Sequence, residues 1–457
     1  MEIILYSAVG LIAILAIFFV IEQPYKFAAV IVFMMFYQFN FDTPLPLDAR
    51  GLLLLLLFVR LYFFDKENID YVNIYLLKNK FFWLILLFTF LILIEPIIDS
   101  IHLVKNIKPI ILPIITLILG FILVKNEDGR KSIFYGILLA GIFSSIDLIV
   151  NFFTRGTLDA VKLPELLLGK VVILNHNTPG ILAGLGVVYI YLAWYRTKLN
   201  RFLLIMVGFL LLLGLFISTS RSALLAIMVT IVIMTLIESD LRHNIKKIFQ
   251  MGAATVVLLV GFFFVYNAFL IKTNSNEHTF LNTVYYRLFE EPLQMFGEEK
   301  AAFNKWTGNR IKGSMKFRSA RWQHDFGKFT SLGLSYQVFG LGPKGYLDIA
   351  QKIYAKNNNI YQRLAPHNGY LIILLERGIL GLVLFLILIV LILISALRAS
   401  KNHQIQLPFI YLLVMLLVYT IAQNAEITSA SSYLTFGAII GDIVRSQNQR
   451  DEENSVL

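Results

Sequence analysis

Apolar stretches that are long enough, or nearly so, to cross the hydrocarbon core of a bilayer recur along almost the whole chain. A membrane-crossing helix needs about 20 such residues. We place the stretches at 2–21, 26–42, 49–64, 81–98, 107–124, 132–153, 176–195, 201–217, 221–238, 248–271, 369–397, 406–423 and 429–445. Lipid cannot satisfy unpaired backbone polar groups, and no strand-like alternation typical of a barrel occurs. The predicted fold class is therefore all-α and polytopic, with a bundle of 12–13 transmembrane helices.

Polar interruptions divide this pattern into four parts. Residues 1–272 are expected to supply the N-terminal transmembrane helices and residues 367–446 the C-terminal ones. Residues 273–366 form the longest interruption, which we expect to be one large and mainly helical loop outside the membrane. The polar tail at 447–457 is expected to be disordered on the cytoplasmic side.

The orientation follows from the short connections, because Lys and Arg accumulate in loops on the cytoplasmic side. Every second connection is basic: 65–80, 125–131, 196–201, 239–247 and 396–405. With these connections in the cytoplasm, the large loop and the tight turn at 218–220 lie on the outer face. The large loop carries thirteen Lys or Arg against seven Asp or Glu, and long loops are exempt from the charge rule. Its positive balance indicates an anionic partner.

Composition limits the chemistry that this chain can perform. The 58% hydrophobic and 15% charged residues are typical of a chain that has lipid as its solvent. The absence of cysteine excludes disulfides and thiolate metal sites. No H-E-x-x-H motif, acidic cluster or phosphate-binding loop of the Walker type occurs, so we expect no metal and no other cofactor.

Two candidate site residues flank apolar stretches at the predicted outer face. Arg221, preceded by Ser220, follows the stretch at 201–217 with almost no gap and begins the stretch at 221–238. An arginine at such a boundary commonly extends toward lipid phosphates, but the tight turn and its hydroxyl groups favour a fixed anion site. His367 and Asn368 directly precede the stretch at 369–397. Asn368 alone would be a helix cap, whereas histidine is the side chain best suited to take a proton from a hydroxyl group near neutral pH.

The large loop contributes a third candidate and one motif that we set aside. Arg318 and Arg321 stand beside Trp322, and arginines can grip a phosphate with two hydrogen bonds. The alternative is a loop helix with a solvated basic face. Residues 340–345 satisfy G-x-G-x-x-G, but a dinucleotide site requires a preceding strand and a βαβ unit. Neither fits this loop, so we interpret the motif as a turn.

In the order of these parts the chain resembles the O-antigen ligase and polymerase superfamily of bacterial membrane glycosyltransferases. The resemblance covers about residues 170–395 and is most specific over Pro366–Gly381. Asn177, in Asn-His-Asn before an apolar stretch, is similar to an asparagine turn in the family. The family fold is a helical bundle with a large periplasmic loop.

The resemblance implies transfer of a glycan from undecaprenyl pyrophosphate to an acceptor hydroxyl group, at the periplasmic face of the bacterial inner membrane. His367 takes the place of the proposed catalytic base, and Arg221 that of the first pyrophosphate-binding arginine. The second arginine is Arg318 by its spacing to Trp322, or Arg321 by its spacing to the turn at Gly340. Asn368, Asn177 and Ser220 are possible supporting residues. The partners implied are the lipid-linked donor, a lipid or glycan acceptor and the bilayer, without nucleic acid.

Three functions remain open at this level. The first is an O-antigen ligase with lipid A-core as acceptor, metal-independent and inverting, and the second is a repeat-unit polymerase with the same donor. The third is a lipid-linked glycan transporter or flippase, which predicts ionisable residues deep in the spans. The apolar stretches contain few such residues, Arg60 and Glu95 among them.

Overall fold

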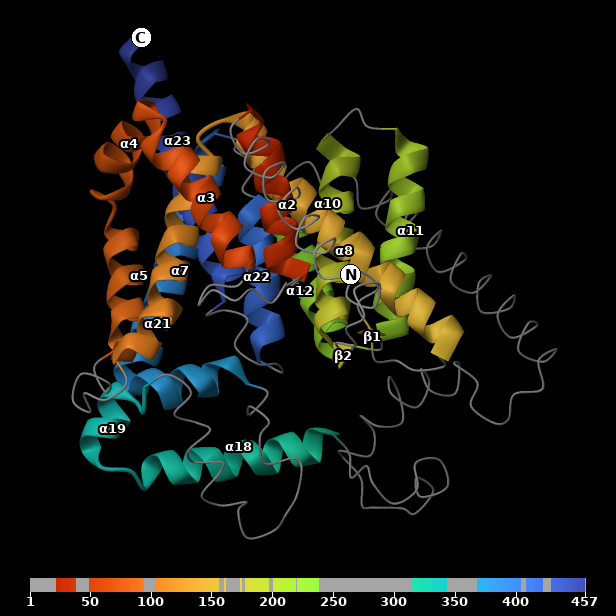
Figure 1. Cartoon of the computed structure of the whole chain (residues 1–457), viewed down its shortest axis with the longest axis vertical. Helices are drawn as coiled ribbons and strands as arrows, with labels where there is room; N and C mark the ends of the chain where they lie inside the picture. Colours follow the sequence, from red (N-terminus) through yellow and green to blue (C-terminus); the bar gives the residue numbers. More distant parts are fainter. Residues whose placement is uncertain are drawn as a thin grey trace, which may run out of the picture.

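The computed structural model is built almost entirely from helices (Figure 1). It describes residues 22–37, 49–93, 103–155, 160–161, 173–174, 177–196, 200–218, 220–237, 314–342, 368–403, 408–421 and 429–456. The described α-helices are α2 (Pro24–Tyr37), α3 (Ala49–Phe63), α4 (Lys66–Tyr71), α5 (Lys80–Phe90), α7 (Leu103–Leu123), α8 (Glu127–Arg155), α10 (Asn177–Arg196), α11 (Arg201–Ser218), α12 (Arg221–Ile237), α18 (Ser314–Thr330), α19 (Leu334–Phe339), α21 (Gly369–His403), α22 (Pro408–Thr420) and α23 (Ala430–Val456). A π-helix, η1 (Val72–Leu76), and a 3-10 helix, η2 (Leu91–Leu93), flank α5.

The connection after α8 contains the strands described for this chain. They are β1 (Ala160–Val161) and β2 (Ile173–Leu174), which pair antiparallel. Each strand is only two residues long, so the chain remains an all-helical protein in its architecture.

Several of the described helices are suited to a membrane. Three are long and apolar enough to cross a bilayer, over Glu127–Asn151, Arg201–Ser218 and Gly369–Arg398. The bent pair of Lys66–Leu76 and Lys80–Phe90, with 87° between its parts, is a fourth if it is one broken span. Shorter apolar helices lie within α2, α3, α7, α10, α12 and α22. A helical membrane protein is confirmed, whereas the count of 12–13 spans stays a prediction, because the stretches at 2–21 and 248–271 lie outside the described residues.

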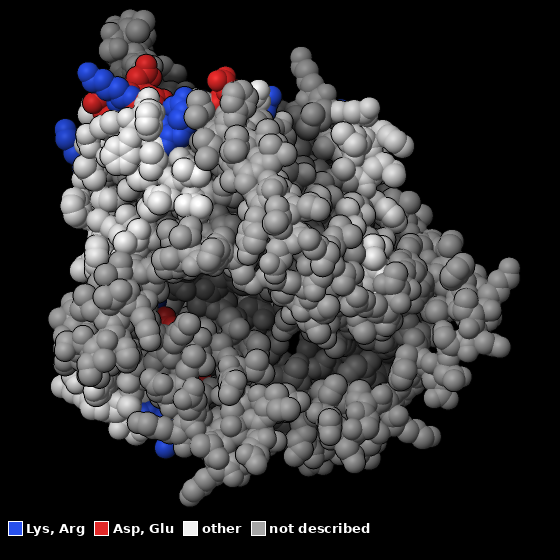
Figure 2. All heavy atoms as spheres, viewed as in Figure 1, with Lys and Arg blue, Asp and Glu red and all other residues white. Residues whose placement is uncertain are grey.

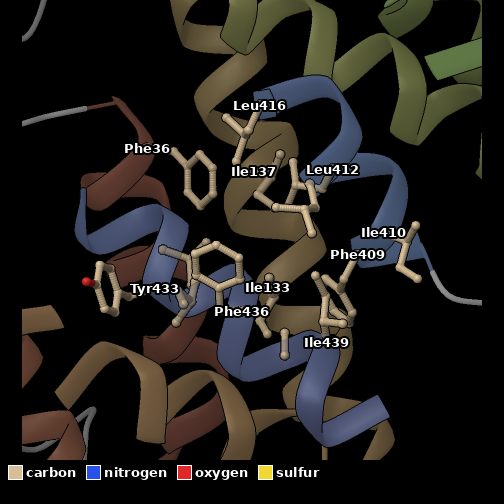
Figure 3. Packing of buried hydrophobic residues seen from close by; sticks show 14 of the residues in the cluster. Phe36, Ile133, Ile137, Phe409, Ile410, Leu412, Leu416, Tyr433, Phe436 and Ile439 are labelled. Atoms are coloured by element: carbon tan, nitrogen blue, oxygen red, sulfur yellow. The ribbon is translucent and has the colours of Figure 1, made fainter. Parts of the chain in front are cut away.

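Helices α7 and α23 pack closely against one another. Helix backbones come near one another where small residues meet them. A side chain at Gly437 would run into the carbonyl group of Leu117, and one at Gly120 would run into that of Leu434. Figure 3 shows the apolar cluster on the adjoining face of α23, where Phe436 and Ile439 meet side chains of α2, α8 and α22.

Charged side chains join several elements at one end of the bundle. Arg130 at the start of α8 lies 3.3 Å from the buried Asp442 of α23, and Lys125 lies 3.3 Å from Glu67 of α4. Figure 2 shows Lys, Arg, Asp and Glu gathered at this end. In Figure 1 the helices α18 and α19 lie at the opposite end. The basic connections at 65–80 and 125–131 thus share one end of the molecule, as the charge pattern requires.

The expectation of a disordered tail at 447–457 is wrong as far as Val456. Helix α23 continues through these residues to Val456. Extending an existing helix costs far less than starting one, and the Gln, Arg and Glu residues of this tail are good helix formers. Polarity alone therefore did not predict its conformation.

Candidate functional site

Helix α12 begins at Arg221, and Ser220 is its N-cap. The Ser220 carbonyl oxygen accepts a hydrogen bond from the Leu224 amide at 3.0 Å, and its Oγ accepts one from the Ala223 amide at 3.4 Å. Ser218 fixes the turn from the other side, because its Oγ accepts from the Ser220 amide at 3.2 Å. Both serines are buried. The turn is therefore a rigid start for α12, although the side chain of Arg221 lies outside the described residues.

The start of α10 lies against this turn. Helix α10 begins at Asn177, and a Cβ atom at Gly180, one turn later, would lie 2.5 Å from Ser218 Oγ and 2.9 Å from Ser220 Cβ. Two helix N-termini therefore lie next to one another. The free N–H groups at such ends attract anions. The side chain of Asn177 lies outside the described residues.

The start of α21 is capped by Asn368. Its Oδ1 accepts a hydrogen bond from the Leu371 amide at 3.1 Å, and its carbonyl oxygen accepts from the Ile372 amide at 3.1 Å. The capping role considered for Asn368 is thus the one that the structure shows. His367, directly before it, lies outside the described residues.

Helix α22 lies between the start of α21 and the pair α10 and α12. The Tyr370 hydroxyl group donates a hydrogen bond to the Leu417 carbonyl oxygen at 3.0 Å. Two residues earlier on α22, the side chain of Met415 lies beside Gly184 of α10, which also contacts Ile227 of α12. The helix starts that carry Arg221 and Asn368 therefore flank the same helix.

Helix α18 packs across the first turns of α21. Phe329 belongs to a buried cluster with Leu371, Leu374 and Leu375, and Trp322 packs against this cluster. Asp325, on the same face of α18, is buried and pairs with His324 at 3.2 Å. Arg318 and Arg321 belong to this helix, but their side chains lie outside the described residues. The choice between these two arginines therefore stays open.

Helix α21 is broken at Gly378, where the sequence predicted one continuous span. Gly378 has a φ of 66° and a ψ of −170°, so the helical hydrogen bonding stops there. The carbonyl groups of Leu375 and Glu376, just before the break, accept hydrogen bonds from the amides of Leu341 and Gly342 at 2.8 and 3.1 Å. The donors belong to the turn that follows α19. Hydrogen bonds from this turn therefore replace the hydrogen bonds that the next residues of a continuous helix would have donated.

The G-x-G motif is this turn, as the sequence analysis predicted. Gly340 and Gly342 have φ angles of 86° and 73°, which glycine adopts without strain. A side chain at Gly340 would run into the backbone of Glu376 and Arg377. Helix α19 precedes the turn, whereas a dinucleotide site requires a strand there.

Sequence reasoning assigned no role to Arg377, which lies within Pro366–Gly381, the most specific part of the resemblance. Its side chain is buried beneath the break, with the guanidinium carbon 4.5 Å from the centre of the Phe88 ring. Its Nη1 lies 3.6 Å from Glu376 Oε2, and among the described residues neither Nε nor Nη1 has a hydrogen-bond partner. The signal in the sequence was a charged pair, Glu376 and Arg377, inside an apolar stretch, because charged residues within a membrane span usually have a functional or structural role.

Sequence reasoning also missed Asp147, which is buried within α8. The Tyr37 hydroxyl group donates a hydrogen bond to its carboxylate, and Ser144, Ser145 and Asn151 are buried on the same helix. The sequence could have indicated Asp147, because it is an acidic residue within the apolar stretch at 132–153. Arg60, counted as deep in a span, instead lies in the last turn of α3.

Within the described ranges, no three His, Asp or Glu residues group closely enough to hold a metal ion. The family model described as Wzy_C, O-Antigen ligase, matches residues 206–386. The matched stretch includes Arg221, Arg318, Arg321 and His367 and runs from α11 into α21. A comparison with curated proteins finds no match.

Proposed function

We propose that this chain transfers a glycan from undecaprenyl pyrophosphate to an acceptor hydroxyl group. The proposal starts from the match over residues 206–386, which places the chain in the O-antigen ligase superfamily. The proposed place is the periplasmic face of the bacterial inner membrane. The proposed acceptor is lipid A-core, which makes the protein an O-antigen ligase.

One structural observation carries this proposal beyond family membership. The starts of α10 and α12 lie side by side, and the start of α21 lies across α22 from them. These starts carry Asn177, Arg221 and Asn368, the last directly after His367. Helix N-termini and arginines both stabilise negative charge, so this arrangement suits a diphosphate bound at the end of the bundle.

The proposed reaction assigns one task to each group. His367 takes the proton of the acceptor hydroxyl group, whose oxygen then attacks the anomeric carbon of the glycan. The bond from that carbon to the pyrophosphate oxygen breaks, and the lipid pyrophosphate leaves with an added negative charge. Arg221, with Arg318 or Arg321, stabilises this charge. Attack opposite the leaving group inverts the anomeric carbon, and the arginines supply the positive charge without a metal ion.

Ser220, Asn177 and Asn368 support the site without entering the reaction. Ser220 and Asn368 cap the helices that follow Arg221 and His367, so they hold these two positions in place. Asn177 begins α10 beside the Ser220 turn.

The first test is transfer by the purified protein from a defined undecaprenyl-pyrophosphate glycan, without added metal. We expect His367→Ala and Arg221→Ala each to lower the transfer rate about 100-fold or more, because each removes a group that acts in the transition state. Lys328→Ala is the matched control, since Lys328 is an exposed basic residue of α18 and should be dispensable. A wild-type rate in either variant would remove that residue from the mechanism.

The acceptor separates a ligase from a polymerase. With lipid A-core supplied, we expect the glycan to appear on it. Transfer only to a second lipid-linked repeat would replace the ligase proposal with a polymerase. In cells, a deletion that accumulates full-length lipid-linked polymer supports a ligase, whereas surface glycan reduced to single repeats indicates a polymerase.

A further inference from the structure

Helix α19 lies against the break in α21. A side chain at Gly378 would run into the backbone of Val338 and Phe339, which belong to α19. From the other side, a side chain at Gly340 would meet the backbone of Glu376. Figure 1 shows α19 beside the bend of α21, at the end of the bundle that also holds α18. The level of α19 relative to α21 is thus set by backbone contact.

The part of α21 beyond the break has the length of one membrane crossing. The part of α21 beyond the break, Ile379 to Arg398, has about 20 residues and a length of about 30 Å, which matches the thickness of the core. Large apolar side chains are exposed along this part, beginning with Ile379 and continuing through Val383 and Leu386. The face that they form is suited to lipid, and it begins directly after the break.

Helix α19 presents exposed apolar side chains of its own. Tyr336, which is 44% exposed, and Phe339 lie about 60° apart around the helix, toward the end of α19 that meets the break. Leu334, which is 76% exposed, points to the other side of the helix. In the described part of the chain, none of the three belongs to the buried cluster that holds α18 on α21. Three large apolar side chains on six residues are unusual for a surface that faces water.

We infer that α19 is an interfacial membrane anchor, with Tyr336 and Phe339 inserted into the leaflet at this end of the bundle. The occupant is lipid, because the backbone of Phe339 lies against Gly378 and the exposed apolar face of α21 begins at the next residue, Ile379. Aromatic residues favour the boundary between headgroups and acyl chains. The exposed Lys328 at the end of α18 suits the phosphate headgroups there. The anchor fixes the height of α18 above the membrane.

Spin labels measure this insertion directly, and the chain favours the method because it contains no cysteine. The full-length protein would carry single substitutions, labelled and reconstituted in phosphatidylcholine and phosphatidylglycerol vesicles. Collisions with oxygen report lipid, and collisions with a water-soluble nickel complex report water. The position tested is Tyr336→Cys. Val383→Cys on the exposed face of α21 and Gln323→Cys on the exposed face of α18 are the references.

We expect the label at 336 to favour oxygen over nickel as the label at 383 does, and the label at 323 to favour nickel. A label at 336 that collides with nickel as readily as the label at 323 would overturn the anchor. A label at 336 shielded from both reagents would overturn it too, because protein and not lipid would then cover α19. All three sites are exposed, so these variants should keep the fold.

Discussion

Arg377 is a cation buried where α21 breaks, with Glu376 as its described ionic partner. Removing charges from water is costly, and the cost is offset only while an opposite charge stays close. The face of the Phe88 ring gives further but weaker compensation. The pair therefore makes the break sensitive to the loss of either charge.

Glu376→Gln is expected to lower the melting temperature of the purified protein, because it leaves the guanidinium group buried without its acid. Breaking a buried pair in this way costs about 3–5 kcal/mol. Adding Arg377→Met removes the uncompensated charge and keeps the side-chain volume, so the double variant should regain part of the loss. Thermal unfolding in detergent measures both. A double variant no more stable than Glu376→Gln would show that the two charges are not coupled.

At this scale the sequence identified candidate site residues better than it described their surroundings. Ser220 and Asn368 stood out because they precede apolar stretches, and both are helix caps. Arg377 was assigned no role because its neighbours, Phe88 and the turn at Gly340, come from distant parts of the chain. The positions of the side chains of Arg221 and His367 relative to one another stay a prediction.

Among the elements, apolar stretches predicted helices well and breaks poorly. The stretches at 201–217 and 221–238 correspond to α11 and α12 within one residue at each end. The stretch at 369–397 gave no sign of a break, because Gly378 alone does not end a helix in lipid. The break depends on amides of Leu341 and Gly342, which approach from another element. Periodicity along one segment carries no information about such contacts.

Gly340→Ala is expected to weaken the attachment of α19 to α21. The backbone at this position has a positive φ and an extended ψ, which costs a residue with a Cβ atom about 1–3 kcal/mol, and the added methyl group has no room. Cleavage of the loop by a low concentration of protease should become faster. Gly327→Ala in α18 is the matched control, since nothing lies within 4 Å of its Cβ position. It should leave cleavage unchanged or slow it, because alanine favours a helix by about 1 kcal/mol over glycine.

If Gly340→Ala were cleaved at the rate of the unaltered protein, the turn would tolerate a side chain. The loop would then be held on α21 chiefly by the apolar cluster around Phe329.

For the molecule as a whole, the charge pattern predicts which end faces the cytoplasm. Lys66 on α4 and Lys328 on α18 are both exposed and belong to opposite ends of the bundle. In cells with a permeable outer membrane, a membrane-impermeant maleimide should label Lys328→Cys. It should label Lys66→Cys only after the inner membrane is opened. The reverse pattern would place the proposed reaction in the cytoplasm, where the lipid-linked donor would have to be used before export.

The pairing of α7 with α23 has a consequence for how the protein is made. Arg130, just after α7, and Asp442 in α23 are 312 residues apart in the sequence. During synthesis α7 enters the membrane long before the helix against which its backbone fits. Until then the backbone of α7 near Leu117 and Gly120 is open to lipid, and Arg130 has not met Asp442. Closure of the bundle therefore waits for the last helix, and nascent chains released before Ala430 would be substrates for membrane proteases.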